Sequence, residues 1–205
     1  MPHVETVAAP CRAEIDKIKG SRFIGNAYPL AEAGAAPDIV EAVAREYPDA
    51  SHHCWAYSLA PGGDQFRFSD AGEPSGTAGR PILDQLEGRD LCFTLVVVTR
   101  FFGGTKLGRG GLVRAYGAAA AAVLDVAEIR RIPITRTCVL ELAYSDTAPI
   151  GGVLAAFDVT PREASYGEKT RLVVEVDTDR WDEFVREITD RTSGRVSIEA
   201  RPSPS

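Results

Sequence analysis

The sequence lacks the features that mark membrane-spanning, secreted and metal-caged proteins. No run approaches the ~18 apolar residues of a membrane span, since even the apolar stretch at 95–98 is followed by Thr99 and Arg100. The first residues show no charged segment followed by an apolar one, so we expect no secretory signal and a cytoplasmic location. The four cysteines form no CxxC pair, so we expect reduced, buried thiols and neither a metal nor a cofactor.

The composition is that of an ordinary globular protein with unevenly placed charge. The 205 residues are 44% hydrophobic and 25% charged, which argues against a disordered chain or a coiled coil and allows one large domain or two small ones. The formal net charge is −6, and residues 141–205 alone hold 13 acidic and 8 basic side chains. Residues 100–131 instead carry six basic against two acidic side chains. An anionic partner would therefore bind this middle segment rather than the C-terminal third.

Hydrophobic periodicity predicts two consecutive domains. In the first part it predicts strands at 11–18, 21–30, 51–59, 65–69 and 92–100, helices at 36–47, 81–86 and 112–129, and a turn at 61–64. The strand at 92–100 is almost wholly apolar, so both of its faces should be covered. The pattern restarts after Pro133 as strand, helix, hairpin, helix and strand, at 134–143, 148–157, 161–166, 170–177, 180–192 and 195–201. This βαββαβ order is ferredoxin-like, and we place the domains at 1–132 and 133–205.

The segment 96–116, VVVTRFFGGTKLGRGGLVRAY, has the residue types of an anion-binding loop. A buried strand leads into five glycines and then a long helix, whose first N–H groups are unpaired and carry a partial positive charge. Glycine lets these amides approach an oxyanion, and Lys106, Arg109 and Arg114 would supply charge. The spacing matches neither a P-loop nor a dinucleotide-binding fingerprint. A purely structural connection with solvated basic side chains stays open as an alternative.

Two other polar segments also have both a functional and a structural interpretation. The glycine-rich loop at 69–80 offers hydroxyl and carboxylate groups on Asp70, Glu73, Ser75 and Thr77. These groups could bind a ligand or only solvate a turn, and two carboxylates are too few for a dedicated calcium or magnesium site. In the run at 52–54, strand alternation puts His52 and Cys54 on one face and His53 on the other. That arrangement favours packed or hydrogen-bonded histidines over a catalytic Cys–His pair.

Four segments resemble the IMPACT/YigZ family in order and spacing: SRFIG (21–25), HHCWAY (52–57), FSDAGEPSGTAGRP (68–81) and VVVTRFFGGTKLGRGGLVRAYG (96–117). The last two are highly specific, and the resemblance covers about residues 10–130. It implies an α+β protein of two α/β sandwiches. The first would have the fold of the second domain of ribosomal protein S5, and the second would resemble the C-terminal ferredoxin-like domain of elongation factor G. The resemblance implies no established catalytic residues.

We therefore expect a non-enzymatic, translation-linked regulator that binds RNA phosphate or a ribosome-associated protein between the two glycine loops. Glycines would give backbone access, three cations would supply charge, and neighbouring basic side chains would add secondary contacts. These residues are Gly103, Gly104, Gly110 and Gly111; Lys106, Arg109 and Arg114; and Arg22, His52, His53 and Arg100. One alternative is an enzyme or sensor for a phosphorylated small molecule or nucleotide that also uses Asp70 and Glu73. The other is an adaptor that binds only proteins.

Overall fold

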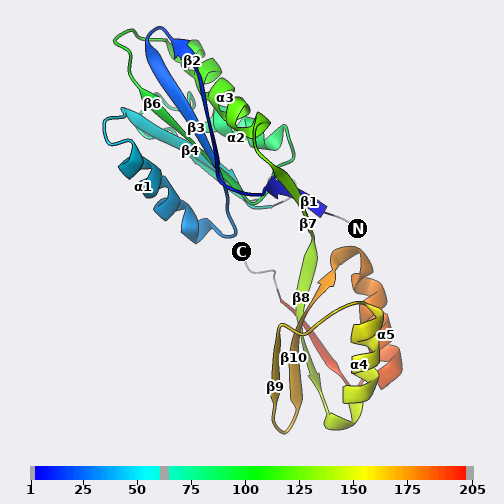
Figure 1. Ribbon diagram of the computed structural model, residues 1–205. Helices are drawn as coiled ribbons and strands as arrows, with labels where there is room; N and C mark the ends of the chain where they lie inside the picture. The colour runs from blue at the N-terminus through cyan, green and yellow to red at the C-terminus, as the bar shows by residue number, and fades with distance from the viewer. Residues whose placement is uncertain (1–2, 61–64, 202–205) are drawn as a thin grey trace. The chain divides into compact units, whose positions relative to one another are not determined.

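The chain divides between Ile132 and Pro133 into two compact units. The computed structural model describes residues 3–60 and 65–201, so the turn predicted at 61–64 lies outside the described residues. Both units combine helices with antiparallel sheets, which confirms the α+β class (Figure 1). Among the described helices, none has the length and apolarity that a membrane crossing requires.

The N-terminal unit is built on a five-stranded sheet in which every neighbouring pair is antiparallel. In spatial order its strands are β2 (Cys11–Ile18), β3 (Ser21–Pro29), β6 (Thr94–Phe101), β4 (His52–Ser58) and β5 (Phe66–Ser69). The middle strand β6 is buried from Thr94 to Arg100. This burial confirms that its apolar sequence marks a strand covered on both faces.

Helices cover both faces of this sheet. Successive side chains of a strand point to opposite faces, so the apolar strand β6 places apolar groups on both of them. Helices α2 (Gly79–Glu87) and α3 (Arg109–Asp125) cover the face that receives Val96 and Val98. The 3-10 turn η1 (Ala33–Ala35) and helix α1 (Ala36–Glu46) cover the face that receives Leu95 and Val97. Figure 1 shows α1 on one side of the sheet and α2 with α3 on the other.

Two further strands correct the predicted end of the long helix. Helix α3 ends at Asp125, and the following chain forms β7 (Ile129–Pro133), which pairs with β1 (His3–Val7) in a separate two-stranded sheet. The prediction of a helix to residue 129 was therefore wrong, and the strand at 3–7 was not predicted. A pairing between the two ends of a domain leaves no trace in local periodicity, which is why the sequence did not reveal it.

The C-terminal unit has the predicted order of strand, helix, hairpin, helix and strand. Its elements are β8 (Thr135–Leu142), η3 (Tyr144–Asp146), α4 (Thr147–Ala156), β9 (Glu163–Tyr166), β10 (Thr170–Asp177), η4 (Thr178–Arg180), α5 (Trp181–Thr192) and β11 (Ser197–Arg201). The antiparallel sheet has the strand order β11-β8-β10-β9. Leu140 and Val174 from the sheet share one apolar core with Ile150 of α4 and Phe184 of α5.

Candidate functional site

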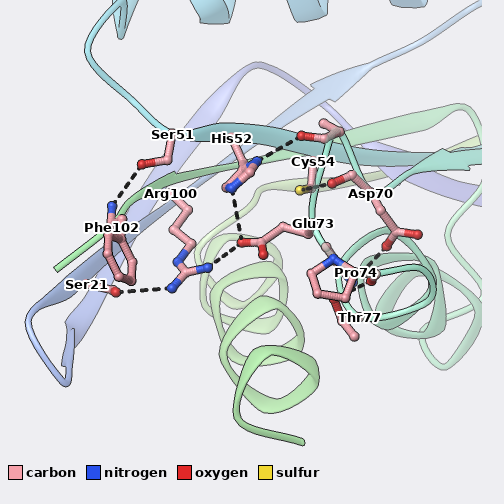
Figure 2. A network of polar contacts seen from close by, with 12 residues as sticks. Ser21, Ser51, His52, Cys54, Asp70, Glu73, Pro74, Thr77, Arg100 and Phe102 are labelled. Carbon is pink, nitrogen blue, oxygen red and sulfur yellow. Dashed lines mark hydrogen bonds and ion pairs between the residues drawn. The ribbon is translucent and has the colours of Figure 1, made fainter. Parts of the chain in front are cut away.

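The loop at 70–78 is attached to the sheet and to α3 by one buried carboxylate, that of Glu73. Its Oε1 accepts hydrogen bonds from Arg100 Nη1 at 2.5 Å and from the Tyr116 hydroxyl at 2.8 Å. The Glu73 and Arg100 side chains are 4% and 5% exposed, and they point toward each other in Figure 2. Arg100 comes from β6 and Tyr116 from α3, so this single group joins a loop, a strand and a helix.

Arg100 makes its remaining contacts inside the protein. Its Nη2 donates to Ser21 Oγ at 3.4 Å, and its guanidinium lies 5.4 Å from the ring centroid of Phe102. The Ser21 hydroxyl also accepts the N–H of Gly103 at 3.1 Å, at the start of the loop at 102–108. Glu73 neutralises the charge of Arg100 in this setting. Arg100, predicted as a secondary anion contact, therefore organises the two loops and does not present a free cation.

Asp70 organises the other end of the same loop. Its carboxylate accepts the backbone N–H groups of Gly76, Ala78 and Gly79 at 2.8, 2.9 and 2.9 Å, where α2 begins. Partial burial alone would raise the pKa of this carboxyl, but the backbone hydrogen bonds outweigh burial and lower the pKa below its ordinary value. Thr77 closes the turn by donating its hydroxyl to the carbonyl of Pro74 at 2.6 Å. The predicted loop residues Asp70, Glu73 and Thr77 thus stabilise the loop itself.

The residues His52, His53 and Cys54 separate onto two faces of β4, as strand alternation predicts. His52 Nδ1 donates to the carbonyl of Ala71 at 2.9 Å, and its Nε2 lies 3.9 Å from Glu73 Oε1. His53 Nδ1 instead hydrogen-bonds with Thr99 Oγ1 at 3.1 Å, and burial lowers the pKa of His53. His53 is therefore not brought together with the glycine loops.

The Cys54 thiol is a poor nucleophile. It is buried and donates to the carbonyl of Asp70 at 2.9 Å. Burial raises its pKa to about 12, so the thiol stays protonated at neutral pH. Because the thiolate is the reactive form, the structure favours a packing role for Cys54 over catalysis. All four cysteines are free, but Cys11 is only partly buried, which corrects the expectation that all are buried.

Helix α3 begins with unpaired amides next to basic side chains. Gly108 is its N-cap with φ +75°, and no side chain caps the first turn. The first helical hydrogen bond runs from the Leu112 N–H to the Gly108 carbonyl at 3.0 Å, so the amides before Leu112, including those of Gly110 and Gly111, have no partner within the helix. Arg109 Nη2 donates to the Ser75 carbonyl at 2.8 Å and thereby connects the two glycine loops.

Some of the remaining predicted site residues are free to bind a ligand, whereas others are already held by contacts within the protein. Lys106 and Arg114 are exposed, and neither forms an ion pair with another described residue. Arg22 is engaged by Glu14 through two hydrogen bonds of 2.9 Å. Gly103 packs so closely on the backbone of Gly20 that a Cβ would overlap it, whereas a Cβ on Gly104 would meet nothing within 4 Å. Lys106 and Arg114 thus leave free positive charge beside the start of α3.

Two residues that hold the loops of this site in place, Tyr116 and Ser21, were not predicted from the sequence. Tyr116 lies on the buried face of its helix, but its hydroxyl reaches Glu73, and burial raises its pKa. Ser21 was overlooked because a lone serine at a strand start carries no distinctive signal. A tyrosine on a buried helix face was the one available hint, since a buried phenol normally requires a hydrogen-bond partner.

Comparison with known proteins identifies the family of the chain. Residues 19–124 match the Impact N-terminal domain, and residues 140–195 match a domain of unknown function. The chain is 35% identical to the IMPACT family member YigZ of Escherichia coli (strain K12), over 93% of this chain and 94% of that protein. It is 32% identical to the IMPACT family member YvyE of Bacillus subtilis (strain 168), with coverages of 88% and 83%. A crystal structure of a hypothetical protein is 34% identical, with a TM-score of 0.75 and full coverage of both chains. The chain belongs to the IMPACT family.

Proposed function

We propose that the N-terminal unit binds the phosphate groups of single-stranded RNA at the start of α3, as a non-enzymatic, translation-linked regulator. The observation that carries this proposal is the set of unpaired amides at Gly110 and Gly111, flanked by the free cations Lys106 and Arg114. Fold analogy gives the link to translation. The N-terminal unit would have the fold of the second domain of ribosomal protein S5. The C-terminal unit would be ferredoxin-like, as in elongation factor G, since its strand order and βαββαβ connectivity fit that fold.

Phosphate is the anion that suits this geometry. Helix-end amides attract a negative charge by only ~0.3–1 kcal/mol, so several side-chain cations are needed as well. Lys106 lies in the loop before α3, Arg109 is the first residue of the helix, and Arg114 lies in its second turn. A repeated phosphate backbone can occupy several such groups at once, and its binding energy grows with each neutralised charge.

The same contacts favour binding over catalysis. The Asp70 carboxylate is occupied by backbone N–H groups, and Glu73 by Arg100 and Tyr116. The Cys54 thiol is protonated. A general base or nucleophile must be free to exchange a proton or attack, and these groups are held in structural contacts.

Fluorescence anisotropy with a labelled oligouridylate over a range of salt concentrations tests the proposal. Three neutralised phosphates predict a slope of log affinity against log salt near roughly −2, about −0.7 per contact. The double variant Lys106→Ala/Arg114→Ala should bring the slope close to about −0.7, whereas Arg45→Ala, on the opposite face of the sheet, should leave it unchanged. Absence of binding at ~50 mM salt, or a double variant that binds like the wild type, would refute phosphate binding at this site.

The two alternative functions give different results in the same experiments. A sensor or enzyme for a phosphorylated small molecule would be stabilised against heat by one nucleotide in a saturable way, without affinity for the RNA. An adaptor that binds only proteins would show neither response.

A further inference from the structure

Two phenylalanine rings lie exposed next to each other on β5, the edge strand of the N-terminal sheet. Phe66 and Phe68 are 41% and 39% exposed. Their ring planes are parallel to within 2°, and the centroids are 6.4 Å apart, because residues two apart on a strand share one face. Among the strands of residues 3–60 and 65–201, β5 pairs with β4 alone, so none of them covers its outer edge. Large apolar rings that are exposed side by side can form a binding surface.

These rings face the same side of the sheet as the proposed phosphate site. Phe68 lies opposite Ala56, which belongs to the core under α2 and α3. Gly79, the first residue of α2, approaches so closely that a Cβ there would come within 2.9 Å of the Phe68 ring. The N–H of Gly79 also donates to the carboxylate of Asp70, which is the first residue of the loop at 70–78. The surface of the rings is therefore continuous with that loop.

The loop connects the rings to the cations. Its Ser75 carbonyl accepts Arg109 at the start of α3. Along β4, Ala56 beside the rings is four residues from His52, which contacts the loop at Ala71. At 3.3 Å per residue, Ala56 and His52 are about 13 Å apart along β4, a length that a few nucleotides of extended RNA can span. The loop at 70–78 thus contacts β4 near the rings and Arg109 at the start of α3, so one extended RNA strand could follow it from one to the other.

We infer that Phe66 and Phe68 form a stacking platform for unpaired bases of the RNA whose phosphates bind at the start of α3. This inference rests on the proposed function and adds the surface that would hold the bases. Single-stranded RNA is the occupant that offers both flat apolar faces and anionic groups at regular intervals, which matches aromatic rings beside a basic loop. Every base has a π-face, so the platform selects unpaired bases with little preference for sequence.

The double variant Phe66→Leu/Phe68→Leu tests the platform, since leucine keeps apolar volume at the strand edge but has no ring. Anisotropy should show an affinity for a 12-nucleotide oligouridylate reduced by at least about fivefold. Affinity for a double-stranded RNA should stay within about twofold, because paired bases cannot stack on the rings. The salt slope should be unchanged, since no phosphate contact is removed. Tyr166→Leu, which removes an exposed ring of the C-terminal unit, is the matched control and should have no effect.

The outcomes separate this inference from the proposed function. If the leucine variant binds the oligouridylate like the wild type, or weakens single-stranded and double-stranded RNA equally, the platform is wrong. The phosphate site would still stand if Lys106→Ala/Arg114→Ala lowers the salt slope. If the intact protein binds no RNA, both are wrong. Phe68→Trp provides a check that does not depend on the stability of the leucine variant: oligouridylate should quench its added fluorescence, and unchanged fluorescence at saturation would overturn the platform.

Discussion

The carboxylate of Glu73 and the guanidinium of Arg100 lie 2.5 Å apart, and both side chains are more than nine-tenths buried. A buried ion pair contributes little net stability, because desolvation offsets much of the attraction between the charges. The main role of the pair is to position the loop at 70–78 against β6 and α3. Removing one of the two side chains should nevertheless destabilise the protein strongly, because the remaining charge stays buried without a partner.

The first prediction concerns that pair. Glu73→Ala should lower the free energy of unfolding by about 3–5 kcal/mol, because it leaves Arg100 charged and buried. Urea denaturation monitored by circular dichroism would measure the loss. Glu14→Ala is the matched control, since it removes the exposed partner of Arg22 and should cost at most about 1 kcal/mol. Equal losses in the two variants would contradict the buried pair as described.

The second prediction concerns the pH dependence of Asp70. Backbone hydrogen bonds lower its pKa in the folded state, so its stabilisation is complete above the unfolded pKa of about 3.9 and is lost as the pH falls through the lower folded value. Asp70→Asn should cost about 0.5–2 kcal/mol at neutral pH, like the loss of a helix cap. The gap between variant and wild type should shrink below about pH 4, as measured by urea titration at several pH values. A gap that stays constant from pH 3 to 7 would show that the charge of Asp70 is not what stabilises the loop.

The third prediction separates two glycines of the same segment. A Cβ on Gly103 would overlap the backbone of Gly20, so Gly103→Ala should destabilise the protein by about 1–3 kcal/mol. A Cβ on Gly110 would be 3.6 Å from Arg114 Nη1, an ordinary contact, in the first turn of a helix. Gly110→Ala should therefore stabilise the protein by up to about 0.5–1 kcal/mol. Thermal unfolding checks both, and a stabilising Gly103→Ala would refute the close approach.

The fourth prediction concerns the cysteines. Burial raises the pKa of all four thiols, to about 12 for Cys54 and to about 11 for Cys138, but Cys11 alone is partly exposed. Iodoacetamide at pH 8 should alkylate Cys11 first in the native protein, because reaction requires an accessible thiolate. Mass spectrometry of digested protein would locate the label, and unfolding in urea should make all four react alike. Rapid labelling of native Cys54 would reopen a nucleophilic role for it.

Much of the secondary structure could be predicted because its signals are local. The strand at 11–18 alternates and coincides with β2, while the helix predicted at 36–47 ends one residue later than α1. The errors fall where a long-range partner decides the conformation. Ile129–Pro133 became a strand only because β1 is available to pair with it, and that pairing took precedence over the helical pattern that precedes it.

The candidate site shows the same division between its residues. The sequence by itself determined that a glycine loop with Lys106 leads into a long helix and that Arg109 and Arg114 lie near their junction, since glycine, charge and helical spacing are properties of neighbouring residues. Only the tertiary structure decided which other cations are free. Arg100 meets Glu73 because the turn between β5 and α2 folds back over β6, and Arg22 meets Glu14 across a hairpin. Whether a charge faces solvent or a buried counter-charge depends on which segments come together in space, and a linear pattern does not contain that information.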